Sequence, residues 1–229
     1  MGAVRRLQTT AIIPVKRLDS AHSRLSESVP ARERRRLAEA MFQDLLAKIR
    51  RSRSIDDAVI VTSDPAAARH ARWLGHSVLE RERDVGHSDD AAAGARWAKA
   101  QGAERVVMLP VDCPMLDPAE LDAHLGDTPR TALIVPDRHG TGTNALVLCP
   151  PDAIVPAFGP DSCARHISRA RAAGISFALE RLDSLALDLD TAEDMAKLRD
   201  ALLLDPDPAP RTAKVLWELG SPAPPVAAA

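Results

Sequence analysis

Asp112 is the residue in this sequence whose position most clearly suits chemistry. It follows an apolar run, Val106–Leu109, that is typical of a short strand buried on both faces. Pro110 and Pro114 flank it and prevent a strand or a helix from continuing through the segment. The carboxylate is therefore expected at the carboxyl end of a buried strand, where open α/β sheets bind ligands. A simple turn would also suit an aspartate here, because aspartate is common in turns.

A second group of acids lies near the end of the chain. Leu185–Asp190 predicts a short strand, whose alternation would project Asp188 and Asp190 from the same face. Helix capping would account for Asp190 alone, but it leaves Asp188 unexplained. Mg2+ takes oxygen ligands, commonly one or two carboxylates together with substrate phosphates. If these acids meet Asp112 at one edge of the sheet, they form a site for divalent cations.

A basic loop follows the first expected strand. It offers cationic and hydroxyl groups suited to phosphates, namely Lys16, Arg17, Ser20, Ser23 and Arg24. The loop has no Walker-type glycine pattern, so it does not predict a P-loop. Standing alone, the segment would favour a solvated surface loop over a phosphate site.

Two later loops are built from small residues. Residues 137–144, DRHGTGTN, contain two glycines among hydroxyl residues, so that backbone N–H groups can approach an anion. The tip of a hairpin is the alternative interpretation. Residues 158–166, FGPDSCARH, lead into a helix whose N-terminus could hold a phosphate or a carboxylate. His139 and His166 lie in these two segments, where they could orient an anion.

Strands that alternate with helices must position these groups. The expected strands cover residues 11–15, 58–62, 77–80, 106–109, 132–136, 145–148, 175–179 and 185–190. The expected helices cover residues 30–51, 65–74, 118–125 and 191–204. A further helix is expected to be capped by Asp89 or Asp90 and to run through Gln101, and another to begin within residues 158–166. This alternation predicts an α/β sandwich around a largely parallel sheet. We expect one domain over residues 1–204 and a Pro- and Ala-rich tail over 205–229, in which residues 212–219 can form a short docked helix.

Composition excludes several classes of protein. The chain has 229 residues and a formal net charge of -2, which gives no general attraction to nucleic acid or membrane. Its three cysteines are widely separated, so neither a zinc site nor a disulfide framework is indicated. No signal peptide and no stretch of about 20 apolar residues is present. These features predict a soluble cytoplasmic protein.

In six segments the sequence resembles a known family, the guanylyltransferases of coenzyme F-420 biosynthesis, which join GMP to a small phosphorylated acid. The matching segments are IIPVKRLDSAHSRL (12–25), VTSDP (61–65), LPVDCPML (109–116), PDRHGTGTNAL (136–146), FGPDSCARH (158–166) and LALDLDTAEDM (185–195). They span nearly the whole chain in order. PDRHGTGTN together with FGPxS is specific to the family, whereas the first loop and the Asp-x-Asp pair occur in other nucleotidyltransferases.

The resemblance implies a Rossmann-like fold, similar to the nucleotide-diphospho-sugar transferases, with three layers and a mostly parallel, mixed sheet. It implies two Mg2+ ions held by Asp112, Asp188 and Asp190. Thr143, Gly159 and Ser162 would bind the phosphate and carboxylate of the acceptor. GTP would be the co-substrate, bound by Lys16, Ser23, Arg24, Ser63, Asp64 and Gly86. Among these residues Lys16, Arg24 and Asp112 would be catalytic.

The implied reaction is an in-line attack of the acceptor phosphate on the α-phosphorus of GTP, which expels pyrophosphate and needs no protein nucleophile. Its unstable product would pass to a downstream deazaflavin transferase. Whether the protein forms a homodimer is left open by the sequence. Two positions depart from the family. His22 stands where many members have lysine, and Gly86-His87-Ser88 replaces the usual Gly-Leu-Asn near the base.

The acceptor is left open among phosphoenolpyruvate, 2-phospho-L-lactate and 3-phosphoglycerate. Phosphoenolpyruvate is favoured because an Ala-, Arg- and Pro-rich composition suggests a high-GC bacterial source. A nucleotidyltransferase for a molybdenum cofactor or a sugar phosphate is the second hypothesis, although the glycine-rich signature of such enzymes is missing after the first strand. A nucleotide-binding module without catalysis is the third.

Overall fold

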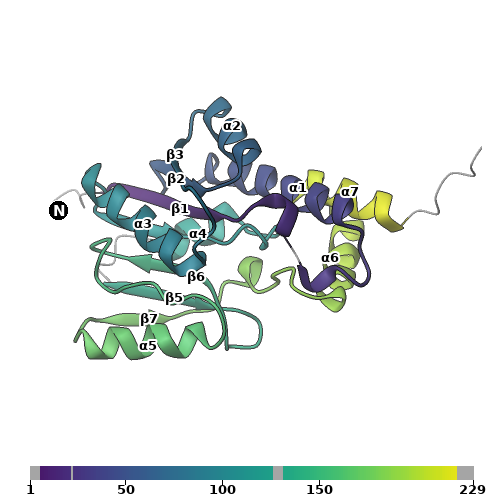
Figure 1. Cartoon of the computed structure of the whole chain (residues 1–229). Coiled ribbons are helices and arrows are strands. Elements are labelled where there is room, and N and C mark those ends of the chain that lie inside the picture. The colour runs from purple at the N-terminus through teal and green to yellow at the C-terminus, as the bar shows by residue number, and fades with distance from the viewer. Residues whose placement is uncertain (1–5, 22, 126–130, 221–229) are drawn as a thin grey trace, which may run out of the picture.

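A computed structural model of the chain describes residues 6–21, 23–125 and 131–220. His22 and the tail residues 221–229, which figured in the sequence analysis, lie outside the described residues. One seven-stranded sheet runs through the molecule between two layers of helices (Figure 1). Its strands are β1 Thr9–Val15, β2 Asp57–Thr62, β3 Ser77–Glu80, β4 Arg105–Met108, β5 Ala132–Pro136, β6 Thr143–Leu148 and β7 Phe177–Leu179.

The strand order is β3-β2-β1-β4-β6-β5-β7. Strand β6 pairs antiparallel with both β4 and β5, and the other pairings are parallel. This mixed, mostly parallel sheet confirms the predicted fold class. The chain winds outward from β1 to β3 and then returns to place β4 on the other side of β1, so a topological switch point lies between β1 and β4.

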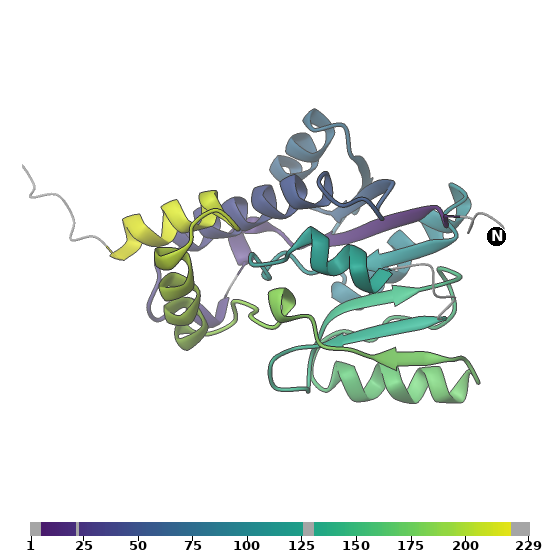
Figure 2. The same cartoon turned by 180° about the vertical axis from the view of Figure 1, so that it is seen from behind.

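Helices cover both faces of the sheet (Figures 1 and 2). They are α1 Ala31–Ile49, α2 Pro65–Trp73, α3 His87–Ala100, α4 Pro118–Leu125, α5 Ser162–Ala172, α6 Ala192–Leu204 and α7 Pro210–Gly220. Strand β1 shows how the layers form, because it is buried along its whole length. Ala11 and Ile13 pack with α1, α2 and α4, whereas Ile12 packs with α3 and α5 on the opposite face. None of the described helices is long and apolar enough to cross a bilayer.

A third apolar cluster lies beyond the end of the sheet, where α6 and α7 pack on α1 (Figure 2). Met41 from α1, Leu198 from α6 and Leu216 from α7 are all buried there. Helix α7, which contributes to this cluster, begins beside the buried carboxylate of Asp44 on α1. Asp44 accepts hydrogen bonds from the backbone N–H of Thr212 at 2.8 Å and from its hydroxyl at 2.8 Å. Asp44 thereby supplies, from another helix, the acceptor that a helix N-terminus needs.

The expected elements agree with the structure within two residues at their ends, with two exceptions. Residues 185–190 form no strand: a 3-10 turn at Asp183–Leu185 is followed by irregular chain. The carbonyl of Ala186 accepts from Arg138 N–H and the N–H of Leu189 donates to the carbonyl of Asp112, so the segment bonds to two different loops and forms no ladder. The prediction of a strand was therefore wrong, although it placed the acids correctly at the end of β4.

The start of α3 is the second exception. The helix begins at His87 with Gly86 as N-cap in a left-handed conformation (φ +110°), so Asp89 and Asp90 occupy its first turn and neither caps it. Asp90 is buried and pairs with Arg81 at 3.1 Å. Acids in the first turn are favourable there because they complement the helix dipole.

Gly94 allows α3 to lie directly on the sheet. A Cβ built on Gly94 would stand 2.4 Å from Cγ2 of Ile12 and 3.1 Å from Cγ2 of Val61. Both neighbours belong to buried strands of the central sheet, so neither side chain can move away freely.

We expect Gly94→Ala to lower the free energy of unfolding by about 1–3 kcal/mol, because the added methyl overpacks α3 against β1 and β2. Denaturant unfolding monitored by circular dichroism measures this change. Helix propensity predicts the opposite sign, since alanine is favoured over glycine inside a helix by roughly 1 kcal/mol. A stabilised variant would therefore show that the close approach is not rigid.

We expect Asp44→Ala to destabilise the protein by about 1–3 kcal/mol, because it leaves the buried donors of Thr212 without an acceptor. Trp217 lies on α7 and its fluorescence reports the docking of this helix directly. The control is Glu39→Ala, which removes an acid paired only at the surface of the same helix. Equal effects of the two substitutions would contradict the capping role of Asp44.

Candidate active site

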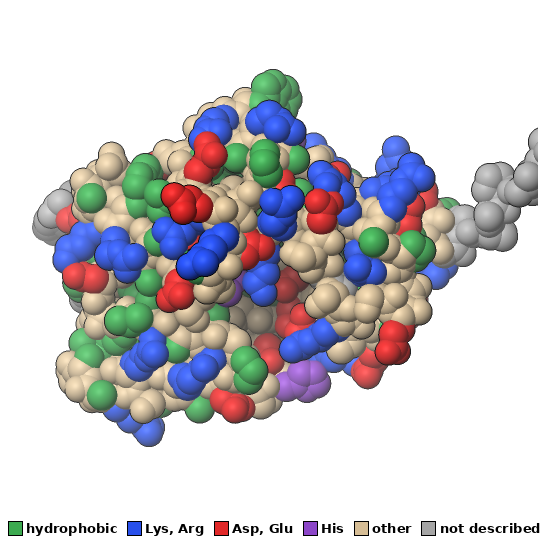
Figure 3. Space-filling model, viewed as in Figure 1, with side chains coloured by type: hydrophobic (Ala, Val, Ile, Leu, Met, Phe, Trp, Pro, Cys, Tyr) green, Lys and Arg blue, Asp and Glu red, His purple; other side chains and the backbone are tan. Residues whose placement is uncertain are grey.

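A hollow of about 360 Å³ lies at the switch point between β1 and β4. Its walls come from the end of β1 and the basic loop after it, including Pro14, Val15 and Lys16, and from Pro110–Asp112 after β4. Figure 3 shows a recess in this face of the molecule with acidic and basic side chains gathered around it. Among the predicted site residues, Lys16, Ser23, Arg24, Asp112 and Asp190 line the hollow. The structure therefore brings the basic loop and two of the three predicted acids together.

Asp112 is partly accessible at the wall of the hollow but is densely surrounded by protein atoms. Burial, followed by the charges of Asp188 and Asp190, raises its pKa to about 7. Lys16 acts in the opposite direction, as a nearby cation should. The backbone also ties the two acidic segments together, because Leu189 N–H donates to the carbonyl of Asp112 at 2.9 Å. Three carboxylates thus share one electrostatic environment.

The other two acids are each held by a neighbour. Asp190 accepts a hydrogen bond from the guanidinium of Arg24 at 2.6 Å. Asp188 is less exposed, and burial raises its pKa, with a further contribution from Asp190 and an opposing hydrogen bond from Asn144. Asn144 also donates to the carbonyl of Leu185 at 2.7 Å, so it fixes the segment that carries the acids. Arg24 in this arrangement neutralises an acid as well as facing the hollow.

The donor set fits a hard divalent cation. Carboxylate oxygens are the ligands that Mg2+ prefers, and the pKa values of Asp112 and Asp188 are raised by burial and by the charge of neighbouring acids, which a bound cation would oppose. Within the described part of the chain, however, no three His, Cys, Asp or Glu side chains stand close enough to form a ready-made metal cage. This agrees with the habit of Mg2+, which completes its shell with water and substrate phosphates.

Lys48 of α1 binds the loop that carries Asp112, and the sequence analysis missed it. It is 4% exposed and its ammonium donates to the carbonyl of Pro114. Burial lowers the pKa of Lys48 to about 8, and Asp44 partly offsets this. The signal in the sequence was its spacing: Lys48 falls seven residues after Met41, on the apolar stripe of α1. A charged residue on a buried stripe needs a partner, and here the partner is the loop that presents Asp112.

The three predicted acceptor residues meet at the N-terminus of α5, beside the hollow but outside its lining. Ser162 begins this helix and is buried, and its N–H donates to the carbonyl of Gly159 at 3.1 Å. Thr143 begins β6 and is also buried. A hydrogen bond of 3.1 Å from Cys163 N–H to the carbonyl of Thr141 joins the two small-residue loops. The loops therefore form one structural unit, as an anion site would require.

The remaining predicted nucleotide residues do not line the hollow. Asp64 caps α2 through Ala66 and Ala67 N–H groups and accepts from Leu18 N–H at 2.9 Å, so its carboxylate holds the basic loop in place. Burial alone would raise its pKa, but these three backbone hydrogen bonds lower it. Ser63 donates to Asp84, whose carboxylate also accepts from Arg17 N–H at 3.2 Å. Gly86 stands before His87, which does line the hollow.

Comparison with known proteins identifies the family. Residues 9–200 match the family described as Guanylyl transferase CofC like. The chain belongs to this family. It is 45% identical over 200 residues to a protein of Conexibacter woesei named phosphoenolpyruvate guanylyltransferase, covering 86% of this chain and 89% of that one. It is 32% identical over 194 residues to the 2-phospho-L-lactate guanylyltransferase of Methanothermobacter thermautotrophicus, covering 84% of each chain.

The fold of this guanylyltransferase family member is shared with sugar-nucleotide enzymes. The crystal structure of a protein from Desulfovibrio desulfuricans G20, assigned as a nucleotide-diphospho-sugar transferase, superimposes with a TM-score of 0.74 at 19% identity. The superposition covers 92% of this chain and 94% of the other. At this identity the likeness concerns the fold alone, and it confirms the fold predicted from the sequence.

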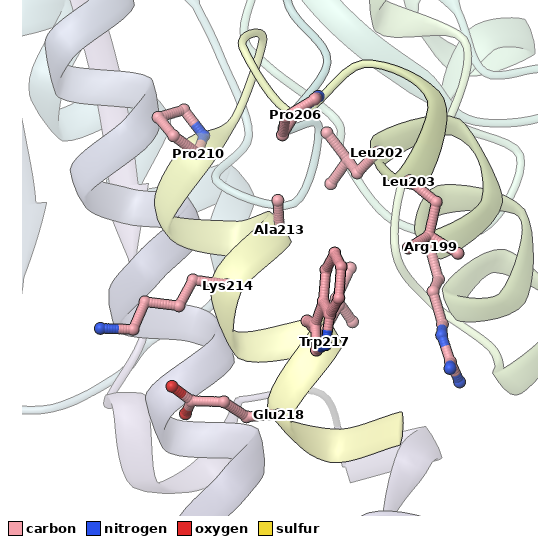
Figure 4. Close-up of a pocket in the computed structure, with 10 residues that line it drawn as sticks. Arg199, Leu202, Leu203, Pro206, Pro210, Ala213, Lys214, Trp217 and Glu218 are labelled. Atoms are coloured by element: carbon pink, nitrogen blue, oxygen red, sulfur yellow. The ribbon is translucent and has the colours of Figure 1, made fainter. Parts of the chain in front are cut away.

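A larger hollow of about 450 Å³ lies between α6 and α7, and neither Asp112, Asp188 nor Asp190 lines it. Figure 4 shows Leu202, Leu203 and Trp217 facing it from the two helices. Its lining is mostly apolar and contains none of the acids discussed above. Phosphoryl chemistry needs charge, so the smaller hollow at the switch point is the candidate active site.

We expect Asp112→Asn to raise the melting temperature of the metal-free protein at pH 8. The folded pKa of Asp112, about 7, lies above the unfolded value of about 3.9, so the free energy of unfolding falls as pH rises between these values. Asparagine removes this loss because it carries no charge. Calorimetry in excess chelator measures the shift, at roughly 2–4 °C per kcal/mol for a chain of this length.

The control is Asp183→Asn, which removes an exposed carboxylate from the same segment of chain. It should leave the melting temperature within 1 °C, about the size expected for an isolated surface change. If Asp112→Asn lowers the melting temperature, the carboxylate is stabilised in the folded protein and the interpretation of the cluster is wrong.

Proposed function

We propose that this protein transfers GMP from GTP to phosphoenolpyruvate and releases pyrophosphate, as a step of coenzyme F-420 biosynthesis. The observation that carries the proposal is the carboxylate cluster at the β1/β4 switch point, which faces a basic loop across one hollow. The relative named phosphoenolpyruvate guanylyltransferase, at 45% identity, favours this acceptor. 2-Phospho-L-lactate and 3-phosphoglycerate are the alternatives, since a relative at 32% identity carries the first of these in its name.

Asp112, Asp188 and Asp190 would hold two Mg2+ ions, which would neutralise charge on the attacking and leaving oxygens. An oxygen of the acceptor phosphate forms a bond to the α-phosphorus of GTP, and the bond from that phosphorus to the bridging oxygen of the β-phosphate breaks. The electron pair leaves with pyrophosphate. The attacking oxygen is already anionic, so the protein supplies no nucleophile and no general base.

The chain's own residues bind and orient the reactants. Lys16 and Arg24 line the hollow and would bind the triphosphate, for which the guanidinium of Arg24 would have to turn from Asp190. Thr143, Gly159 and Ser162 bind the phosphate and carboxylate of the acceptor at the N-terminus of α5, where backbone N–H groups and the helix dipole favour anions. Positioning of this kind and charge neutralisation supply most of the rate enhancement in phosphoryl and nucleotidyl transfer.

The product would be an acid joined to GMP through a mixed diphosphate linkage. Because such a product is unstable, we propose that a downstream deazaflavin transferase consumes it in the same compartment, the cytoplasm, where GTP and glycolytic acids are found. A homodimer is compatible with this reaction but is not required by the site, since the residues proposed to bind both reactants belong to one chain.

We expect the purified protein to release pyrophosphate from GTP only when Mg2+ and one of the three acids are present. The assay includes the downstream transferase and its deazaflavin acceptor, which draw off the product. Asp112→Ala should reduce the rate by at least about 100-fold, because one metal-binding carboxylate is lost while the fold is kept. Asp183→Ala, in an exposed acid of the same segment, is the matched control and should retain wild-type activity.

Turnover with a sugar phosphate or a pterin in place of all three acids would overturn the proposed function. GTP binding without any turnover would indicate a nucleotide-binding module. Full activity of Asp112→Ala would remove the carboxylate cluster from the mechanism.

A further inference from the structure

His166 connects the two small-residue loops but has no place in the reaction described above. It lies on α5 one turn after Ser162 and is completely buried. Both of its ring nitrogens are engaged. Nε2 lies 2.8 Å from the backbone nitrogen of Ala157, and Nδ1 lies 3.0 Å from Oγ1 of Thr143.

These two contacts determine the protonation state of the ring. The backbone N–H of Ala157 can only donate, so Nε2 of His166 must accept and carries no hydrogen. A neutral imidazole has one N–H group, which must therefore be on Nδ1. Burial, with further contributions from Arg169 and Arg165, lowers the pKa of His166 to about 4, so the ring is neutral at physiological pH.

The tautomer of His166 decides which role the hydroxyl of Thr143 can play. Nδ1–H donates to Oγ1 of Thr143, which leaves the hydroxyl hydrogen to be donated elsewhere. Within residues 6–21, 23–125 and 131–220, no second hydrogen bond to this hydroxyl is seen. A buried hydroxyl with one lone pair occupied and its hydrogen available is arranged to donate to an acceptor that is not part of the chain.

The same ring also holds the loop that precedes α5. His166 accepts from Ala157 N–H, and its ring packs edge-on against Phe158 with centroids 5.1 Å apart. Phe158 in turn packs against His87, a lining residue of the nucleotide hollow, at 4.7 Å. The carbonyl of Phe158 accepts from Ser88 at 3.2 Å. His166 therefore lies at the junction between the acceptor loops and the start of α3.

We propose that His166 is a positioning residue whose neutral Nδ1–H tautomer turns the hydroxyl hydrogen of Thr143 toward an anionic oxygen of the phosphorylated acid. The inference rests on the proposed function, because that function places the acceptor at Thr143. His166 itself does not touch the substrate. Its contribution is to make Thr143 a hydrogen-bond donor before the acceptor arrives, which saves the cost of reorienting the hydroxyl.

Two substitutions at His166 separate its two hydrogen bonds. Glutamine can still accept from Ala157 N–H but has no donor at the position of Nδ1, whereas asparagine keeps a donor near Thr143 and gives up the contact with Ala157. We expect His166→Gln to reduce kcat/KM for the acceptor by about 10–100-fold, the range for a lost hydrogen bond to a charged group. The KM for GTP should stay within about twofold, and His166→Asn should recover most of the loss.

Thr143→Val tests whether the effect passes through the hydroxyl, since valine keeps the shape of threonine without its oxygen. We expect Thr143→Val to match His166→Gln, and the double variant to be no worse than Thr143→Val alone. Additive losses in the double variant would show that His166 acts independently of Thr143, and would overturn the proposal.

The tautomer can be measured in the wild-type protein without any variant. A long-range 1H–15N correlation spectrum, assigned through the contact of the ring with Ala157 N–H, should show an unprotonated Nε2 and a protonated Nδ1 at pH 7. A protonated Nε2 would overturn the inference even if every variant failed to fold. Failure of the wild type to turn over any of the three acids would overturn the proposed function, and this role of His166 with it. An active wild type whose His166→Gln variant keeps its acceptor KM would overturn this inference alone.

Discussion

The burial of Asp112 and Asp188 beside each other and beside Asp190 is the constraint on which the rest of this site depends. Like charges in a partly buried site are unfavourable unless something opposes them, so the chain must hold these acids together against their own electrostatics. It does so with the ion pair between Arg24 and Asp190 and with contacts of the backbone: Leu189 N–H binds the carbonyl of Asp112, and Asn144 fixes the other segment. The remaining negative charge of the acids can be neutralised by a bound cation and by the basic loop.

Buried polar anchors hold the loops and helices around this site in addition to the apolar core. Lys48 of α1 holds the carbonyl of Pro114, Asp64 at the start of α2 holds the N–H of Leu18, and Asp44 holds the start of α7. Each anchor is a buried charged group that binds a backbone group, so removal of its side chain would leave a backbone N–H or carbonyl without its partner. The loops on either side of the hollow are thereby fixed to helices on one face of the sheet.

The small-residue loops that carry Thr143 and Ser162 follow a different logic, because hydrogen-bond direction at Thr143 sets what this side chain can bind. A backbone N–H at Ala157 sets the tautomer of His166, and the tautomer sets the direction in which the hydroxyl of Thr143 can donate. Phe158 packs between His166 and His87, and so places the start of α5 beside a residue that lines the hollow.

The sequence by itself determined the order of strands and helices, the fold class and the family, because buried apolar runs, proline and glycine boundaries and short motifs are local signals. It also placed Asp112 at the end of β4. The tertiary structure alone decided that residues 185–190 form no strand, since their backbone groups bond to two separate loops. It alone decided the partners of Lys48, Asp44 and His166, because each pairs with a residue distant in the chain or set by a loop's conformation. Hydrogen-bond direction and buried charge depend on three-dimensional neighbours, which no local pattern specifies.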